Sequence, residues 1–352
     1  MPTTTFEKGA HMTYQSGEIY FVRELDSASS GWSPFVKIGL VADPRISAER
    51  LLEHQTGNPR KLDIPAGHIV KTAAVSMVEA QLHRRFSKSR VGGEWFKFSE
   101  EGELVSAIDH ARQLAAEAEK LVPILLEADR LQRLPSSEAL IPASEEHFLL
   151  AGQQAASKEM QKRISNLEKE IKSFLTSQRS KGEEIDSAAE VRVVTFKPKF
   201  QETEFSENYP DVYKKFLVEA KKWDARFLNK IKWSEEIGLD QQFAEDFLEA
   251  ESTVKSAIES VSVSDLGEPI SALNRLSGLA EWDETVSTAK LKVACGTAAG
   301  IDGVCTWKRL DVVREVFDLD SFVKTHPDLY TSYLSDETTK EYVLPSKGSK
   351  RK

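Results

Sequence analysis

The sequence predicts an α+β N-terminal domain, followed by long helices and a mainly α-helical C-terminal region. In the first hundred residues, short alternating runs of β-branched and aromatic residues are interleaved with short helical patterns. Longer Ala/Glu/Leu-rich stretches of helical periodicity follow. A length of 352 residues favours two or three domains rather than one core.

Strands are expected first at residues 17–23 and 35–41, which carry GEIYFV and VKIG and are bounded by Gly, Ser and Pro. The segment DPRISAERLLEHQTGNP then predicts a helix. Asp43 suits its N-cap and Pro44 its first helical position, and the Gly-Asn-Pro after it ends it.

The rest of the N-terminal domain follows the same alternation. HIVKTAAV (68–75) predicts a third strand, and SMVEAQLHRRF (76–86) predicts a helix in which Ser76 and Glu79 form a capping box. GGEWFKF predicts a turn and a short return strand. The domain is expected to cover residues 13–100.

Long helices are expected next. Residues 101–133 form an Ala/Glu/Leu-rich helical pattern with Pro123 inside it, and LPSSEALIPAS interrupts the helices. In the second helix, over about 145–182, apolar residues alternate four and three apart, the spacing of a short coiled coil. They are Met160, Ile164, Leu167, Ile171 and Phe174. This stripe is expected to pack on another copy of the chain or on the preceding helix.

The C-terminal domain is expected over residues 190–340. It contains a sequence pattern that occurs twice, here called the internal echo. FSENYPDVYKKFL (205–217) and FVKTHPDLYTSYL (322–334) share a pattern at an offset of 117 residues, too long for a solenoid repeat. The echo indicates either a diverged duplication or the same helix-starting sequence used at two places. We favour a structural role for it over a binding role. Residues 341–352 are expected to form a basic tail.

Composition limits the classes of function. Residues 1–100 hold 13 Lys and Arg against 11 Asp and Glu, a net charge of +2, whereas the remainder carries 34 against 45, a net charge of −11. Contact with a polyanion such as DNA is therefore expected in the first hundred residues. No apolar run is long enough to span a membrane. The GAHM within residues 1–12 is typical of a cloning scar, so these residues are expected to be a tag or disordered sequence.

Only two cysteines are present, Cys295 and Cys305, which argues against a disulfide framework and favours a reducing cytoplasm. A structural zinc site needs four ligands in most cases, and the nearest histidine is His326. We therefore expect both cysteines to be buried apolar residues.

Candidate catalytic residues are spread over several elements of the N-terminal domain. Arg50 and His54 are four residues apart, so they project from one face of a helix. Tyr20 and Lys37 lie on two successive strands, and Glu79 is expected in the first turn of the next helix.

In this combination the sequence resembles the GIY-YIG endonuclease superfamily, in its phage-type branch, over about residues 15–100. The matching residues are the Ile-Tyr of GEIYFV, the Lys-Ile-Gly of VKIG, HQTGNP with Arg50 before it, E-x3-H-x2-F, and GEWF. The resemblance implies a small antiparallel sheet flanked by helices. The first motif reads EIY, the second has lysine where many members have tyrosine, and the family's late asparagine has no obvious counterpart.

Phosphodiester cleavage requires a nucleophilic water, charge stabilisation on the phosphoryl oxygens and help for the leaving oxygen. Glu79 is expected to be the only side-chain ligand of Mg²⁺ or Mn²⁺, because Mg²⁺ keeps most of its waters. The planar guanidinium of Arg50 can donate two parallel hydrogen bonds to the phosphate. An ammonium on Lys37 would favour the phenolate of Tyr20, and His54 would relay a proton.

Further polar residues surround this set. His83 is expected either to orient Glu79 or to serve as a capping or core histidine. A basic group beside Glu79 is expected to follow a DNA backbone or, equally, to be a solvated helix end. Its members are Arg84, Arg85, Lys88, Arg90 and Lys97.

The expected function is that of a metal-dependent DNA endonuclease, in restriction, mobile-element or phage-conflict biology. The alternative is an inactive nucleic-acid-binding or scaffold protein that keeps the fold.

Overall fold

The computed structural model describes residues 14–25, 31–56, 58–86, 89–234, 236–239 and 241–345. It confirms the predicted fold class: an antiparallel sheet in the N-terminal part is followed by long helices, with 51% of residues in helices and 25% in strands. The chain forms two compact units, one ending at Glu127 and the other beginning at Ala128. The expected boundaries at residues 100 and 182 differ from this division, because the helix after residue 100 continues through it.

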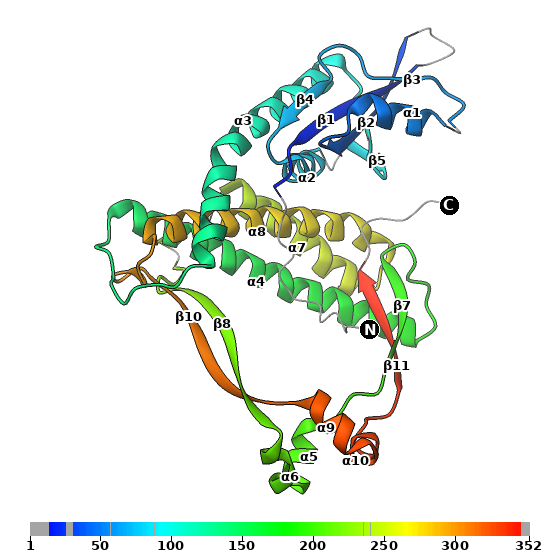
Figure 1. Cartoon of the computed structure of the whole chain (residues 1–352). Helices are drawn as coiled ribbons and strands as arrows, with labels where there is room; N and C mark the ends of the chain where they lie inside the picture. Colours follow the sequence, from blue (N-terminus) through cyan, green and yellow to red (C-terminus); the bar gives the residue numbers. More distant parts are fainter. Residues whose placement is uncertain are drawn as a thin grey trace. The chain divides into compact units, whose positions relative to one another are not determined.

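The N-terminal unit is built on one antiparallel sheet of the order β3-β1-β2-β6-β5, in which β4 also pairs with β1 (Figure 1). Its two long strands confirm the predicted pair around the EIY and KIG motifs. The strands are β1 (Gly17–Leu25), β2 (Trp32–Ala42), β3 (Leu62–Asp63), β4 (Ile69–Thr72), β5 (Arg90–Gly92) and β6 (Trp95–Lys97).

Helices cover both faces of this sheet, which explains why β1 is buried along most of its length. On one face, Tyr20 packs in a cluster with Leu51 of α1 (Ser47–Gln55). On the other, Phe96 contacts the ring of His83 from α2 (Val75–Arg85), with centroids 5.2 Å apart. The next helix, α3 (Glu101–Gln132), adds His110 against Phe86 on that side.

The start of α1 differs from the prediction, because the helix begins at Ser47 rather than at Pro44. The carboxylate of Asp43 accepts a hydrogen bond from the hydroxyl of Ser16, so it joins the start of β1 instead of capping a helix. The first turn uses a distant acceptor, since the backbone N–H of Ser47 donates to the carboxylate of Glu18 at 2.9 Å.

The predicted capping box in α2 is also wrong. The helix begins one residue before Ser76, with Ala74 at the N-cap position, and no side chain caps it. Glu79 is therefore the fifth residue of α2 and lies in its second turn rather than its first.

In the C-terminal unit, α4 (Glu145–Ser180) begins with a capping box between Ser144 and His147. Its predicted apolar stripe is buried in one core with α7 (Gln241–Glu259) and α8 (Gly267–Cys295). Met160 and Ile164, for example, are in the same cluster as Val254 and Leu273. The packing partners are thus later helices of the same chain, not the preceding helix, and self-association stays a prediction.

Two pairs of strands join this helical core to four short helices (Figure 1). Strand β8 (Leu217–Asn229) pairs with β10 (Cys305–Phe317). The first residues of β10 also pair with the short β9 (Gly300–Ile301). Strand β7 (Ala189–Phe196) pairs with β11 (Thr338–Pro345). The short helices are α5 (Glu202–Asn208), α6 (Pro210–Lys215), α9 (Leu319–Thr325) and α10 (Pro327–Ser332). Because β11 extends to Pro345, the expected basic tail cannot begin at residue 341.

The internal echo corresponds to the two helix pairs, and Pro210 and Pro327 begin α6 and α10 as expected. Residues 117 apart make equivalent contacts. Phe200 stacks on Tyr330 at 5.5 Å, and Phe317 stacks on Tyr213 at 4.8 Å. The two halves therefore form an aromatic core of approximate two-fold symmetry, which supports a structural role for the echo.

Cys295 and Cys305 are free and buried, as expected, with their sulfurs 3.9 Å apart. Within the described residues, no helix is long and apolar enough to cross a membrane.

Candidate functional site

The hydroxyl of Tyr20 is the centre of the candidate site. Tyr20 lies on β1 and is 1% exposed. Its oxygen is 3.1 Å from Nε2 of His54, and Arg50 also hydrogen-bonds to it. Both partners come from α1, so the four-residue spacing places them on one helix face, as predicted. Arg50 makes an ion pair with Glu53 on the same helix.

Gly39, the glycine of the KIG motif, makes room for this tyrosine. It is paired with Tyr20 in the β1–β2 register. A Cβ atom on Gly39 would lie 2.6 Å from the Tyr20 ring, closer than a real contact allows. The glycine is therefore required by the position of the ring, not by an unusual backbone conformation.

Gly39→Ala is expected to displace the Tyr20 ring and destabilise the protein by about 1–3 kcal/mol, the usual scale of overpacking in a core. Urea denaturation would measure the loss, and the Tyr20–His54 contact should be absent from the variant's structure. Wild-type stability with an unmoved ring would contradict this account.

Lys37 forms an ion pair with Glu94, which lies in the turn between β5 and β6. Lys37 is 9% exposed, so its charge is held inside the sheet by this carboxylate. The expectation that Lys37 favours the Tyr20 phenolate is not supported. The cation that lowers the pKa of Tyr20 is Arg50, through a hydrogen bond and its charge.

Burial decides the protonation of the Tyr20–His54 pair. It raises the pKa of Tyr20 above 10, although Arg50 opposes this effect. Burial also lowers the pKa of His54 below 6.5, and the charges of Lys37 and Arg50 lower it further. At neutral pH, a protonated phenol therefore faces a neutral imidazole. With its proton on Nδ1, His54 can accept from the phenol through Nε2.

Glu79 is the most perturbed carboxylic acid of the site. Burial, followed by the charge of Glu94, raises its pKa from 4.5 to about 7, while Lys37 and Arg90 act in the opposite direction. Burial and the neighbouring carboxylate both make ionisation of Glu79 unfavourable. A bound cation would offset this cost by stabilising the negative charge. The residues therefore fit a divalent metal with Glu79 as a ligand.

Among the described residues, no group of three or more His, Cys, Asp and Glu is arranged to hold a metal ion. Of the two roles expected for His83, its contacts are those of a core histidine rather than of a residue that orients Glu79. Its Nε2 lies 2.9 Å from the carbonyl oxygen of Ile38 and its ring packs on Phe96, as for a core histidine.

The raised pKa of Glu79 predicts a pH-dependent stability. The folded protein holds a proton that the unfolded chain releases, so this stabilisation is complete below pH 4.5 and is lost as pH rises to about 7. Glu79→Gln should therefore match wild type in urea denaturation at pH 4.5 and be more stable by about 2 kcal/mol at pH 8. Equal pH dependence in both proteins would contradict the raised pKa.

The predicted basic group is divided by the structure. Arg90 lies near Glu79 and lowers its pKa, and Lys97 is exposed on β6. Arg84 is half-buried on α2, and Lys88 lies outside the described residues.

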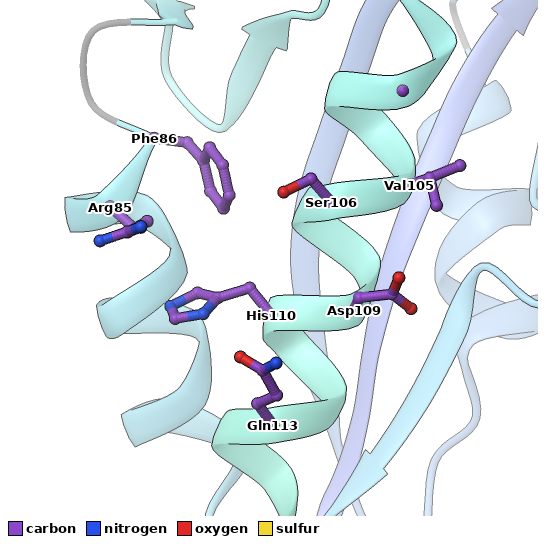
Figure 2. A pocket seen from close by; sticks show the side chains of 8 residues that line it. Arg85, Phe86, Val105, Ser106, Asp109, His110 and Gln113 are labelled. Carbon is purple, nitrogen blue, oxygen red and sulfur yellow. The ribbon is translucent and has the colours of Figure 1, made fainter.

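Arg85 is directed elsewhere. With His110 and Phe86 it lines a cavity of about 450 Å³ between α2 and α3 (Figure 2). None of the predicted catalytic residues lines this cavity.

Glu94 was not among the predicted site residues, although GEWF was part of the resemblance. The structure pairs it with Lys37, and its charge raises the pKa of Glu79. Glu94 lies directly after a Gly-Gly turn and before a strand, a position that can present a carboxylate at the edge of a sheet. Gly39 was quoted within KIG, but its contact with Tyr20 required the strand register.

The T5orf172 domain matches residues 17–114. This is a phage-associated domain related to GIY-YIG and HNH-like nucleases, and the match contains every candidate catalytic residue described above. It covers less than half of the chain. No curated protein and no solved structure matches the chain.

Proposed function

We propose that this protein is a metal-dependent DNA endonuclease whose active site is the Tyr20–His54–Arg50 group together with Glu79. The convergence of Arg50 and His54 on the Tyr20 hydroxyl carries the proposal. The match to a domain related to nucleases supports it. DNA is the proposed partner, and the reducing cytoplasm expected from the cysteines is the proposed location.

In this proposal, water attacks the phosphorus atom, the P–O bond to the leaving ester oxygen breaks, and that oxygen takes a proton from solvent. Tyr20 accepts the proton of the water as it passes its own proton to Nε2 of His54, whose lowered pKa keeps it neutral beforehand. The side chain of Arg50 is 33% exposed, so its guanidinium can contact a phosphoryl oxygen while bonded to Tyr20.

Glu79 would hold Mg²⁺ or Mn²⁺. When bound, such an ion stabilises charge on the phosphoryl oxygens and lowers the pKa of its water. Lys37 and Arg90 favour the ionised form of Glu79 that a metal needs, and Glu94 disfavours it. Glu94 is itself held by Lys37, which limits this repulsion.

A cleavage assay tests the proposal. The purified chain is incubated with supercoiled plasmid and with single-stranded DNA, in the presence of Mg²⁺, Mn²⁺ or EDTA. We expect nicked or linear products with either metal and none with EDTA. Metal-independent binding without cleavage would instead identify the alternative, an inactive DNA-binding or scaffold protein.

Lys37→Met is expected to lower the cleavage rate at pH 7 by about two orders of magnitude, within the usual scale of electrostatic groups. Loss of the ammonium leaves Glu94 unpaired and raises the pKa of Glu79 further, so the deficit should shrink at pH 9. Lys37→Arg, which keeps the charge, is the matched control. A pH–rate profile identical to wild type would show that Lys37 is only a strand residue.

A further inference from the structure

The antiparallel ribbon of β8 and β10 is exposed along most of both faces. Each strand has 13 residues, so the ribbon is about 40 Å long. At the end of the ribbon that contains Trp307 and Phe227, one face packs against a hydrophobic core that includes Leu131. The opposite face carries Val218, Ala220, Lys222, Asp224, Arg226 and Leu228, paired with Val316, Arg314, Val312, Leu310, Lys308 and Thr306.

Charge is sorted by face on this ribbon. The side facing away from the core, here called the basic face, has four exposed cations. They are Lys222, Arg226, Lys308 and Arg314. Within these two fully described strands, Asp224 is its only acidic residue. The other face exposes Glu219, Asp311 and Glu315 with a single exposed cation, Lys221.

The cross-strand pairing makes this arrangement unfavourable for a ribbon that only contacts water. Arg226 lies directly opposite Lys308, and Glu219 directly opposite Glu315. Like charges in directly opposed positions destabilise a sheet. The side chain of Arg226 is 74% exposed, and its ion pair with Asp224 is long at 3.7 Å. An anionic ligand on the basic face would remove the repulsion there.

We propose that the basic face of the β8–β10 ribbon binds duplex DNA. The major groove admits a two-stranded β-ribbon, and four cations on one face match the phosphates that border it. The exposed aliphatic residues Leu310 and Leu228 on that face can contact thymine methyl groups. The inference extends the proposed function by naming a second DNA contact, in the region whose net charge is −11.

The test measures binding without cleavage. Binding of a labelled duplex to the full chain is followed by fluorescence anisotropy in EDTA, over a range of salt concentrations. The double variant Arg226→Ala/Lys308→Ala is compared with Lys221→Ala, which removes a cation from the other face of the same ribbon. All three substitutions are at exposed positions and should leave thermal stability unchanged or, for the opposed pair, slightly higher.

We expect the double variant to bind about tenfold more weakly and the slope of log K against log salt to fall by about 2, one for each lost phosphate contact. Lys221→Ala should bind as wild type does. An unchanged double variant, an equal loss in Lys221→Ala, or no binding of DNA by the wild-type chain in EDTA would overturn the inference. Plasmid cleavage by the double variant is assayed separately, so a failed ribbon contact is distinguished from a failed nuclease.

Discussion

Glu79→Gln is expected to lower the rate of DNA cleavage by about three orders of magnitude, the scale set by groups that stabilise transition-state charge. Glutamine keeps the shape of the side chain but cannot supply an anionic oxygen to a metal. Because the pKa of Glu79 is raised to about 7 in the fold, its charge is costly there, and the variant should fold at least as well as wild type. Single-turnover cleavage at saturating Mg²⁺ measures the effect.

Glu119→Gln, at an exposed position on α3, is the matched control and should cleave as wild type does. Metal binding by Glu79→Gln should weaken in parallel with cleavage, which calorimetric titration with Mn²⁺ would show. If Glu79→Gln cut DNA at the wild-type rate, the one-carboxylate mechanism would be excluded.

Tyr20→Phe and His54→Ala are each expected to slow cleavage by about two to three orders of magnitude, as for removal of a group in proton transfer. Their atoms lie 3.1 Å apart and act in sequence on one proton. The double variant should therefore be no slower than the slower single variant, since groups that act as a unit are not additive. Rates are compared under single turnover, with the exposed Leu52→Ala on α1 as control.

If the double variant instead showed the summed free-energy losses of the two single variants, Tyr20 and His54 would act independently. If Tyr20→Phe cleaved DNA at the wild-type rate, the tyrosine hydroxyl would have no part in the mechanism. Tyr20 would then be only a core residue opposite Gly39.

The sequence was informative where the functional geometry is local. The spacing of Arg50 and His54 fixes their common helix face whatever packs against it. The alternating run around Tyr20 likewise predicts a strand without knowledge of its neighbours. The error at the start of α1 arose because Ser47 finds its acceptor on Glu18, far away in sequence, which no local capping rule can detect.

Features that depend on long-range packing could not be predicted. The contact of Lys37 with Glu94 requires β2 to pair with β6. The pKa of Glu79 depends on burial, which its sequence neighbours do not reveal. The β8–β10 ribbon was missed within a region expected to be mainly helical, because strands exposed on both faces show a weak hydrophobic alternation.

The pH–rate profile of wild-type DNA cleavage at two Mg²⁺ concentrations tests the central claim most directly. If Glu79 must ionise to hold the metal, the acidic limb of the profile should lie near pH 7 when Mg²⁺ is below its dissociation constant. Above that constant, the limb should move to lower pH by about one unit for each tenfold increase in Mg²⁺, because metal and proton compete for one carboxylate. An acidic limb that does not move with Mg²⁺, or the absence of metal-dependent cleavage at any pH, would contradict the account.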